Sequence, residues 1–376
     1  MIETTKTKKV AEFFAGIRLM RVGLEQSGWT TVLANDIDPI KRRLYLNHFM
    51  GSGDNFILED IHKLSADSFP CTDLSLAGRR AGLQGEHSSA FWGFVDIIQG
   101  MGNRKPPLIL LENVAGFLTS NNGKDFYDAL KALNNQGYSV DAFIIDAARF
   151  VPQSRVRLFI VGKLTIENSL PTCHYFPETE IRPAKLIKFI FDNPEIDWSI
   201  NHHLPNLPKV SNDLQSIVEK ISKSSSLWWN KERVEYLLNQ TFDRHLSKVS
   251  VLKEGKKITY LTAFRRVRNG KSMAEIRFDG IAGCLRTPKG GSARQILLEV
   301  GKGNINIRLL TPRECARLMG ADNFNLSGTA NEALFGFGDA VCVPVVSWIA
   351  DNYLNQELSK MSDAKEQRTE TYAFTA

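Results

Sequence analysis

Short apolar runs alternate with stretches of helical periodicity over residues 10–162 of this 376-residue chain. The run VAEFFAG has the length of a buried strand and ends at a glycine, and the following IRLMRVGLEQSGW spaces its apolar residues helically. Similar signals recur in TTVLANDIDP, in PPLILLENV, at 124–136, in YSVDAFIIDA and in RLFIVG. This alternation predicts an α/β fold with a doubly wound, mostly parallel sheet and helices on both faces.

The pattern changes after Gly162, because residues 163–280 are punctuated by proline and serine and show no strand–helix repeat. Helical signals return where Thr311 precedes Pro312 in a capping arrangement, and in the apolar face of GDAVCVPVVSWIADNYL. We therefore expect a larger unit, residues 1–164 plus 305–356, and a smaller, irregular recognition region, residues 165–304. The polar residues 357–376 are expected to form a flexible tail.

Composition places the chain among soluble globular proteins, with 43% hydrophobic and 23% charged residues. We see no secretory signal and no apolar run of the roughly 18 residues that cross a bilayer, so we expect a cytoplasmic monomer without a membrane partner. The five scattered cysteines include no CxxC pair, and Cys173-His174 lacks companion ligands, so neither a disulfide framework nor a metal site is expected.

Positive charge is concentrated in one part of the chain. Residues 251–310 contain 13 Lys and Arg against four Asp and Glu, whereas the whole chain carries a net charge of +6. Such a surplus attracts phosphate backbones, although a solvated basic surface would have the same composition.

Several segments carry side chains that suit chemistry. Cys71, in FPCTDLSLAG, lies in an expected loop, where a thiol serves as a packing group, a metal ligand, a disulfide partner or a nucleophile. The single-glycine turn in FFAGIRL, followed by Asp36 or Asp38 as a partner for ribose hydroxyls, suits a ligand without phosphates such as S-adenosylmethionine; the alternative is an ordinary strand–helix turn. Glu112 ends a buried strand and either faces a site or caps the next helix. Arg155 and Arg157 should point to the same side, as an anion site or a surface ion-pairing group.

Taken together and in this order, the segments resemble the cytosine-5 DNA methyltransferase family. FFAGIRL, ANDID, EDI, FPCTDLSLAG, LENV and QSRVR are followed by a variable region, then by RLLTPRECARLMG and GFGDAVCVPV. The resemblance implies that S-adenosyl-L-methionine donates a methyl group to C5 of a cytosine flipped out of a specific duplex DNA sequence. It also implies the cytoplasm of a prokaryotic cell or phage-infected host, and a cognate restriction endonuclease that acts separately.

The resemblance assigns roles to individual positions. Cys71 would attack C6, Glu112 would be the proton partner of N3, and Arg157 would bind O2 with support from Arg155. Residues 72–92 would form a loop that closes over the flipped base. The cofactor would contact Phe14, Ala15, Gly16, Leu19, Asp36, Ile37, Asp60, Ile61, Pro70, Asp339 and Ala340. DNA would contact Ser75, Arg265, Arg266, Arg268 and Lys271, and residues 165–280 would read the sequence.

Four positions depart from the commonest pattern of this family. Thr72 replaces Gln, Arg18 replaces a glycine, His87 replaces Arg and Asp339 replaces Asn. None of these changes removes a group that the reaction requires. The rival functions are the same chemistry on tRNA and a catalytically silent DNA-binding protein; the long basic region favours DNA over tRNA, and the retained Cys71 favours catalysis.

Overall fold

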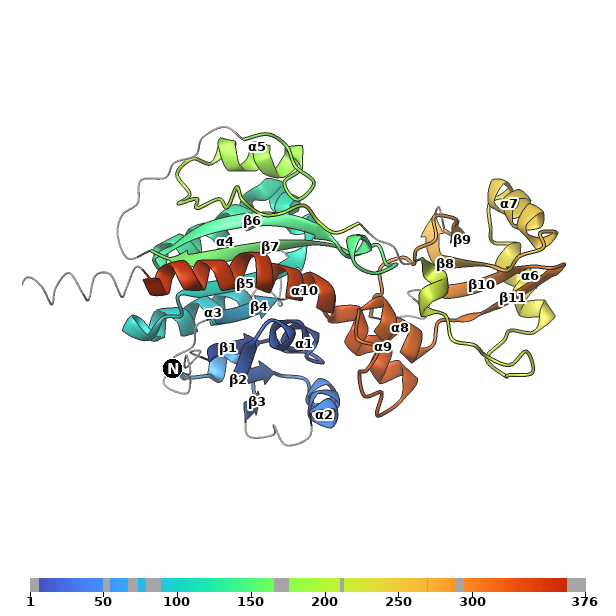
Figure 1. Cartoon of the computed structure of the whole chain (residues 1–376), viewed down its shortest axis with the longest axis horizontal. Coiled ribbons are helices and arrows are strands. Elements are labelled where there is room, and N and C mark those ends of the chain that lie inside the picture. The colour runs from blue at the N-terminus through green and yellow to red at the C-terminus, as the bar shows by residue number, and fades with distance from the viewer. Residues whose placement is uncertain are drawn as a thin grey trace, which may run out of the picture.

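The computed structural model describes residues 7–49, 55–66, 74–78, 89–165, 176–209, 213–268, 270–287 and 294–363, with the backbone alone for 74–78, 89 and 268. Within these residues the larger unit contains a seven-stranded sheet in the order β3-β2-β1-β4-β5-β7-β6 (Figure 1). Strands β1 to β5 pair in parallel, and β7 is antiparallel to both of its neighbours. The doubly wound, mostly parallel sheet is confirmed. Its strands are β1 Lys8–Phe13, β2 Trp29–Asp36, β3 Phe56–Leu58, β4 Leu74–Gly78, β5 Leu108–Val114, β6 Tyr138–Asp146 and β7 Val156–Leu164.

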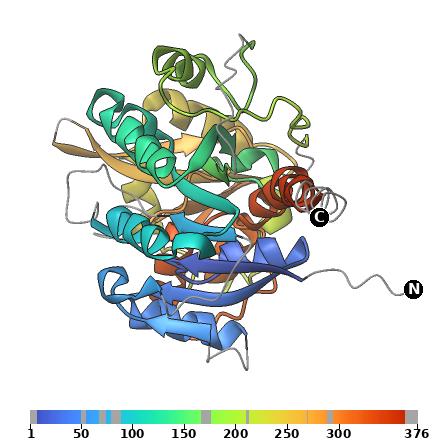
Figure 2. The same ribbon diagram turned by 90° about the vertical axis from the view of Figure 1, so that its left-hand side faces the viewer.

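Helices cover both faces of this sheet and enclose two hydrophobic cores (Figure 2). Helices α3 (Ser89–Gly100) and α4 (Lys124–Asn135) pack on one face, and α1 (Leu19–Gln26) and α10 (Val343–Ile349) pack on the other. Side chains of β5 alternate between the two cores, with Ile109 entering the first and Leu110 the second. This double burial explains the unbroken apolar run in PPLILLENV.

Strand β4 lies in the middle of the sheet, between β1 and β5. Its first residue, Leu74, pairs with Val10 and Leu108, and its last, Gly78, pairs with Glu112. The prediction that residues 72–92 form a single loop is therefore wrong for Leu74–Gly78, and also for residues 89–92, which begin α3. The apolar–polar alternation of β4 stops after Leu76, so its sequence alone does not separate it from a loop, and its pairing with β1 and β5 identifies it as a strand.

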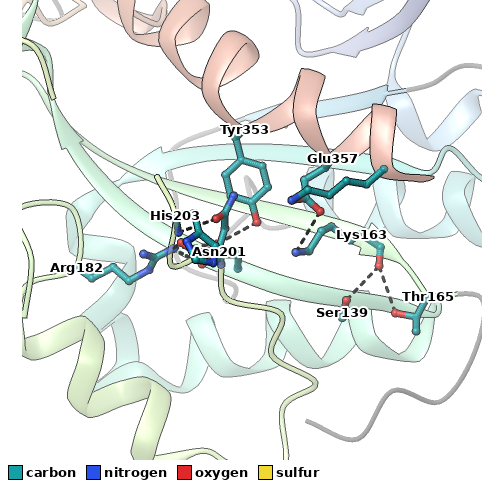
Figure 3. Close-up of polar contacts among 10 residues, drawn as sticks. Ser139, Lys163, Thr165, Arg182, Asn201, His203, Tyr353 and Glu357 are labelled. Carbon is teal, nitrogen blue, oxygen red and sulfur yellow. Dashed lines mark hydrogen bonds and ion pairs between the residues drawn. The ribbon is translucent and has the colours of Figure 1, made fainter. Parts of the chain in front are cut away.

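Residues 176–207 pack on the larger unit, which differs from the predicted boundary at residue 165. Helix α5 (Ala184–Asp192) contributes to the core on the α4 side of the sheet. Arg182 donates hydrogen bonds of 2.9 Å to both carboxylate oxygens of Asp141 on β6, and the Tyr353 hydroxyl donates to the same carboxylate at 2.9 Å (Figure 3). This buried network fixes the segment to the sheet and to the C-terminal helix.

The C-terminal helix continues past residue 357, where the tail was expected to begin. After α10 the chain passes through a π-helical turn, Ala350–Leu354, and stays helical to Asp363. Glu357 is 8% exposed and pairs with Lys163 of β7 at 3.6 Å (Figure 3). The segment Ala330–Asp363 is long and apolar enough to cross a membrane, but most of its apolar window is buried inside the protein, as in a core helix.

The smaller unit contains, within the described residues, a four-stranded antiparallel sheet in the order β11-β10-β8-β9 (Figure 1). Helices α6 (Lys231–Leu238) and α7 (Asp243–Lys253) cover one face, where Leu237 and Val249 pack against Leu261. Because β11 extends to Leu309, this unit ends later than the predicted limit at residue 304. The strands are β8 Thr259–Arg268, β9 Lys271–Arg277, β10 Ile296–Gly301 and β11 Asn304–Leu309.

The two units meet at the segment QSRVR, residues 153–157, which leads into β7. Gln153 forms a parallel bridge with Ala282, which follows β9 in the chain. Its side-chain amide donates to the Leu318 carbonyl at 2.7 Å, at the end of α8 (Pro312–Leu318), and its oxygen accepts the Leu285 N–H at 2.9 Å. One fully buried glutamine thus fixes the return of the chain from the smaller sheet.

Candidate active and cofactor site

The predicted cofactor turn follows β1 and contains three residues with left-handed backbone. Their φ angles are 54° at Phe14, 58° at Gly16 and 82° at Arg18. The Gly16 N–H donates to Oδ2 of Asp36 at 2.9 Å, and the Ala15 N–H donates to the Asn35 carbonyl at 2.9 Å. These bonds join the carboxyl ends of β1 and β2, the edge at which parallel sheets bind ligands.

Asp36 and Ile37 present a carboxylate and an apolar side chain beside this turn. Asp36 is 5% exposed, and its second oxygen accepts the Asp38 N–H at 2.9 Å. Each carboxylate oxygen has a further lone pair that can accept a hydrogen bond from a hydroxyl group. Ile37 is 53% exposed, an unusual state for a large apolar residue next to a buried carboxylate. The two side chains suit a ribose and the flat face of a base.

Asp60 and Ile61 lie on the next connection, after β3. The Asn35 amide donates to the Ile57 and Glu59 carbonyls at 3.0 and 2.9 Å, which fixes this segment against β2. Asp60 accepts the His62 N–H at 3.0 Å and caps a short 3-10 turn, while the Ile61 side chain is only 4% exposed. Ile61 can therefore address a ligand through its backbone more readily than through its side chain.

Residues 336–340, at the end of α9 (Ala330–Asp339), lie against the turn. A Cβ on Gly336 would lie 2.4 Å from Cγ2 of Ile17. The helix therefore lies so close to the turn that only glycine fits at position 336. Asp339 pairs at 3.2 Å with Lys41 of α2 (Pro39–His48), the helix that follows Asp36. The predicted positions Asp339 and Ala340 therefore lie beside the other cofactor positions.

Leu19 is the exception among the predicted cofactor residues of α1. Its side chain is 1% exposed and packs in a core with Leu44 and Phe337. The structure therefore places Leu19 in the packing that holds α1 against α2 and α9, behind the turn.

Glu112 and Arg157 form a buried ion pair at the carboxyl end of β5. Arg157 Nε lies 2.7 Å from Glu112 Oε1, and the two residues are 6% and 8% exposed. The N–H does not point along this line, so the contact is electrostatic rather than a well-aligned hydrogen bond. Arg157 Nη1 also donates to the Val156 carbonyl at 2.9 Å. A carboxyl and a guanidinium thus meet near the carboxyl ends of the parallel strands, the edge at which such sheets bind ligands.

Arg155 is directed to other partners, which corrects the prediction that both arginines serve one site together. It is 1% exposed and donates to the Leu285 carbonyl at 3.0 Å, to the Gly338 carbonyl at 3.1 Å and to the Ala340 carbonyl. Five donors in a planar group suit such a multiple contact. Arg155 therefore connects β7, the return from the smaller sheet and the cofactor side of α9.

Cys71, Pro70, Thr72 and His87 lie outside the described residues. Gly78, the last residue of β4, pairs with Glu112 on β5. Cys71 precedes β4 in the chain, so the strand direction does not by itself bring it to the Glu112–Arg157 pair. Its role as a nucleophile stays a prediction.

The match to known proteins covers nearly the whole chain. The model for the C-5 cytosine-specific DNA methylases matches residues 8–355. The chain belongs to this family. The methylase is 29% identical to the type II methyltransferase M.DsaV of Dactylococcopsis salina, over 93% of this chain and 87% of that protein. It is 25% identical to the type II methyltransferase M.HhaI of Haemophilus parahaemolyticus, over 91% and 92%.

Solved structures share the fold of the methylase at lower identity. The Dnmt2 methyltransferase of S. pombe superposes with a TM-score of 0.60 at 20% identity, covering 94% of this chain and 99% of that one. A putative DNA modification methyltransferase of an E. coli prophage superposes with a TM-score of 0.53 at 17% identity, covering 93% and 99%. At these identities the likeness extends to the fold alone.

The predicted DNA contacts of the methylase fall on different surfaces. Arg265 and Arg266 are neighbours on β8 and therefore point to opposite faces of the sheet. Arg265 lies on the helix-covered side, with Cζ 5.9 Å from the rings of both Trp229 and Tyr236. Arg266 lies on the opposite face, is about half exposed and pairs with Glu275 at 3.1 Å.

Lys271 shares the face of Arg266 and is exposed, whereas only the backbone of Arg268 is described. Ser75 is a residue of β4, and its backbone pairs with Ala11 and Ile109 inside the sheet. Only the backbone of Ser75 is described, so its predicted phosphate contact stays a prediction.

Two residues of the site were missed in the sequence. Gln153 belongs to the motif QSRVR but received no predicted role. A polar side chain between Pro152 and Ser154, close to a boundary between two units, is a signal that the residue connects them. Lys41 was missed because its partner, Asp339, is almost 300 residues away, and surface lysines are common.

Proposed function

We propose that this methylase transfers a methyl group from S-adenosylmethionine to C5 of a cytosine flipped out of a specific duplex DNA sequence. The reaction would proceed through a covalent bond between the Cys71 sulfur and C6 of the base. The observation that carries the proposal is the buried Glu112–Arg157 pair at the carboxyl end of β5, in a chain of the cytosine-specific family. A proton partner and a cation beside each other are what a cytosine ring needs when a nucleophile adds to it.

The residues act in a defined order in this proposal. Cys71, as a thiolate, adds its electron pair to C6 while Glu112 gives a proton to N3, which leaves an enamine with nucleophilic character at C5. Arg157 holds O2 and stabilises the charge that develops on the ring. After methyl transfer a base removes the C5 proton, the C5–C6 double bond re-forms as Cys71 leaves as a thiolate, and N3 returns its proton to Glu112.

S-adenosylmethionine supplies an electrophilic methyl group on a sulfonium. The residues present fit its nucleoside part, because Asp36 offers carboxylate acceptors and Ile37 an exposed apolar surface beside a turn with one glycine. The same turn lacks the several glycines with which a dinucleotide site approaches a pyrophosphate. Asp60, Ile61 and Ala340 would complete the pocket from the neighbouring connections.

Recognition of the DNA sequence is assigned to the smaller unit. Its β8–β9 hairpin presents Arg266 and Lys271 on the face that α6 and α7 leave uncovered. Arginine reads guanine in the major groove, and lysine contacts phosphates. Since the relatives are named type II methyltransferases, we also propose that a restriction endonuclease of the same specificity acts separately from this chain.

The decisive experiment is a covalent trap. Duplex DNA that carries 5-fluorocytosine at the target blocks the final step, because fluorine cannot leave C5 as a proton does. With S-adenosylmethionine present, the methylase should form an adduct that survives denaturation and gel electrophoresis. Mass spectrometry should place the DNA on the peptide that contains Cys71.

The variants assign the roles in this trap. Cys71→Ala should form no adduct, and Glu112→Gln should form it much more slowly, since attack on C6 without a proton partner leaves unstabilised charge. An equal adduct with Cys71→Ala would overturn the mechanism. Its absence with wild-type protein would mean that Cys71 does not reach the pair beside β5. An adduct on tRNA and on no duplex DNA would keep the chemistry and overturn the substrate.

A further inference from the structure

Helix α2 and helix α9 are joined by a row of polar contacts beside the cofactor turn. Lys41 pairs with Asp339 at 3.2 Å, and two residues further along α2, Arg43 pairs with Glu332 at 2.6 Å. At the far end of α2 the Asn47 amide donates to the Ser327 hydroxyl at 2.8 Å. The row therefore begins at the ligand edge of the sheet and extends away from it.

Lys41 is the member of this row that is closest in the chain to the ribose position. Asp38 caps α2 by accepting the N–H groups of Ile40 and Lys41, and the Asp38 N–H donates to Asp36. The position of Lys41 is thus set by the same turn that orients Asp36. Lys41 in turn holds Asp339, so one ammonium connects the start of α2 to the end of α9.

The residues next to Asp339 are fixed by further contacts. Gly336 lies against Ile17, a Cβ on Gly338 would lie 2.3 Å from the Thr287 nitrogen, and Arg155 binds the Gly338 and Ala340 carbonyls. The side toward α2 is the one that Lys41 closes. This chain has Asp339 where an asparagine is usual, so the contact is between full charges.

We propose that Lys41 is a positioning residue for cofactor binding, which acts by holding Asp339 so that residues 339–340 close the pocket. This inference rests on the proposed function, because it assumes that the turn binds S-adenosylmethionine. The side chains are 18% and 37% exposed, so the ion pair is partly screened by water. A contact of this kind changes affinity by about two- to five-fold.

The test is a double-mutant cycle read by the dissociation constant of S-adenosylmethionine in isothermal titration calorimetry. Lys41→Met should weaken binding about two- to five-fold in 50 mM salt, and Lys41→Arg should restore most of it. In an Asp339→Asn background, Lys41→Met should have no further effect. Arg43→Met is the matched control, since it breaks the neighbouring α2–α9 pair and should leave the dissociation constant unchanged.

Separate readouts distinguish positioning from a general structural role. Lys41→Met should raise the KM for S-adenosylmethionine while kcat and the KM for DNA stay within error, and 0.5 M salt should remove the difference from wild type. An equal effect of Lys41→Met in both backgrounds, or an equal effect of Arg43→Met, would overturn the inference alone. Wild-type protein that does not bind S-adenosylmethionine would overturn the proposed function and this inference with it.

Discussion

Replacement of Arg18 by glycine tests whether the cofactor turn depends on a buried cation at a position where glycine is usual. Arg18 is fully buried, and its guanidinium carbon lies 3.8 Å from the centre of the Tyr45 ring and 3.7 Å from that of Phe49. Its φ of 82° is left-handed. Two opposing effects therefore decide the result: the strain that glycine relieves and the aromatic contacts that it removes.

The magnitudes favour the aromatic contacts. A left-handed backbone costs an L-residue about 1–2 kcal/mol, and glycine avoids this cost. Glycine also has more conformational entropy in the unfolded state, which lowers the stability of the variant by about 0.5–1 kcal/mol. Each desolvated cation–π contact contributes about 2 kcal/mol, and two rings are involved. Removal of the cost of burying a charge offsets part of this sum. We expect Arg18→Gly to lower the free energy of unfolding by about 2–3 kcal/mol.

The comparison with alanine isolates the backbone term. Arg18→Ala loses the same contacts but keeps the left-handed penalty, so it should be about 1 kcal/mol less stable than Arg18→Gly. Urea unfolding followed by tryptophan fluorescence at pH 7.5 measures both differences, with wild type and Arg18→Lys alongside. The reasoning is refuted if Arg18→Gly is as stable as wild type, or if Arg18→Ala is the more stable of the two variants.

Three further predictions concern other parts of the molecule. Arg182→Met should lower the free energy of unfolding by about 3–5 kcal/mol, because it leaves the Asp141 carboxylate buried without its cation; urea unfolding checks this, and Asp141→Asn in the same chain should restore part of the loss. Burial raises the pKa of Glu12 to about 8, so wild type should lose stability as pH rises from about 4.5 to 8 while Glu12→Gln does not; equal pH profiles in chemical unfolding would contradict this. Exchange of residues 213–309 for those of a relative should change the methylated sequence, and bisulfite sequencing that shows an unchanged motif would place recognition elsewhere.

The sequence was a good guide wherever a local pattern and the fold impose the same requirement. The apolar run before Glu112 predicted β5, because a strand between two helical layers is buried on both faces. Thr311 before Pro312 predicted a helix cap, and the structure has a full capping box in which Glu314 makes the reciprocal hydrogen bond. The cofactor positions at the ends of β1 and β2 came together for the same reason, since adjacent parallel strands end at one edge.

The sequence failed where contacts are distant in the chain. Arg155 and Arg157 are two residues apart, and this spacing predicted that they serve one site. Arg155 instead donates to the carbonyls of Leu285, Gly338 and Ala340, which come near it only in the folded protein. Strand β4 was missed because its pairing partners, rather than its five residues, define it. Arg265 and Arg266 were grouped by charge, although neighbouring residues of a strand face opposite ways.

The helix that begins at Val343 has a consequence for how the protein is made. It fills the face of the sheet formed by the first strands and helix of the chain, where a Cβ on Gly23 would lie 2.6 Å from Cβ of Val346. During synthesis on the ribosome, the apolar residues of that face, including Leu24 and Trp29, therefore stay uncovered until residues more than 300 positions later have emerged. Nascent chains with such a face attract chaperones and aggregate when these are scarce. A premature stop shortly before Val343 would leave a product with every proposed catalytic residue and no stable fold.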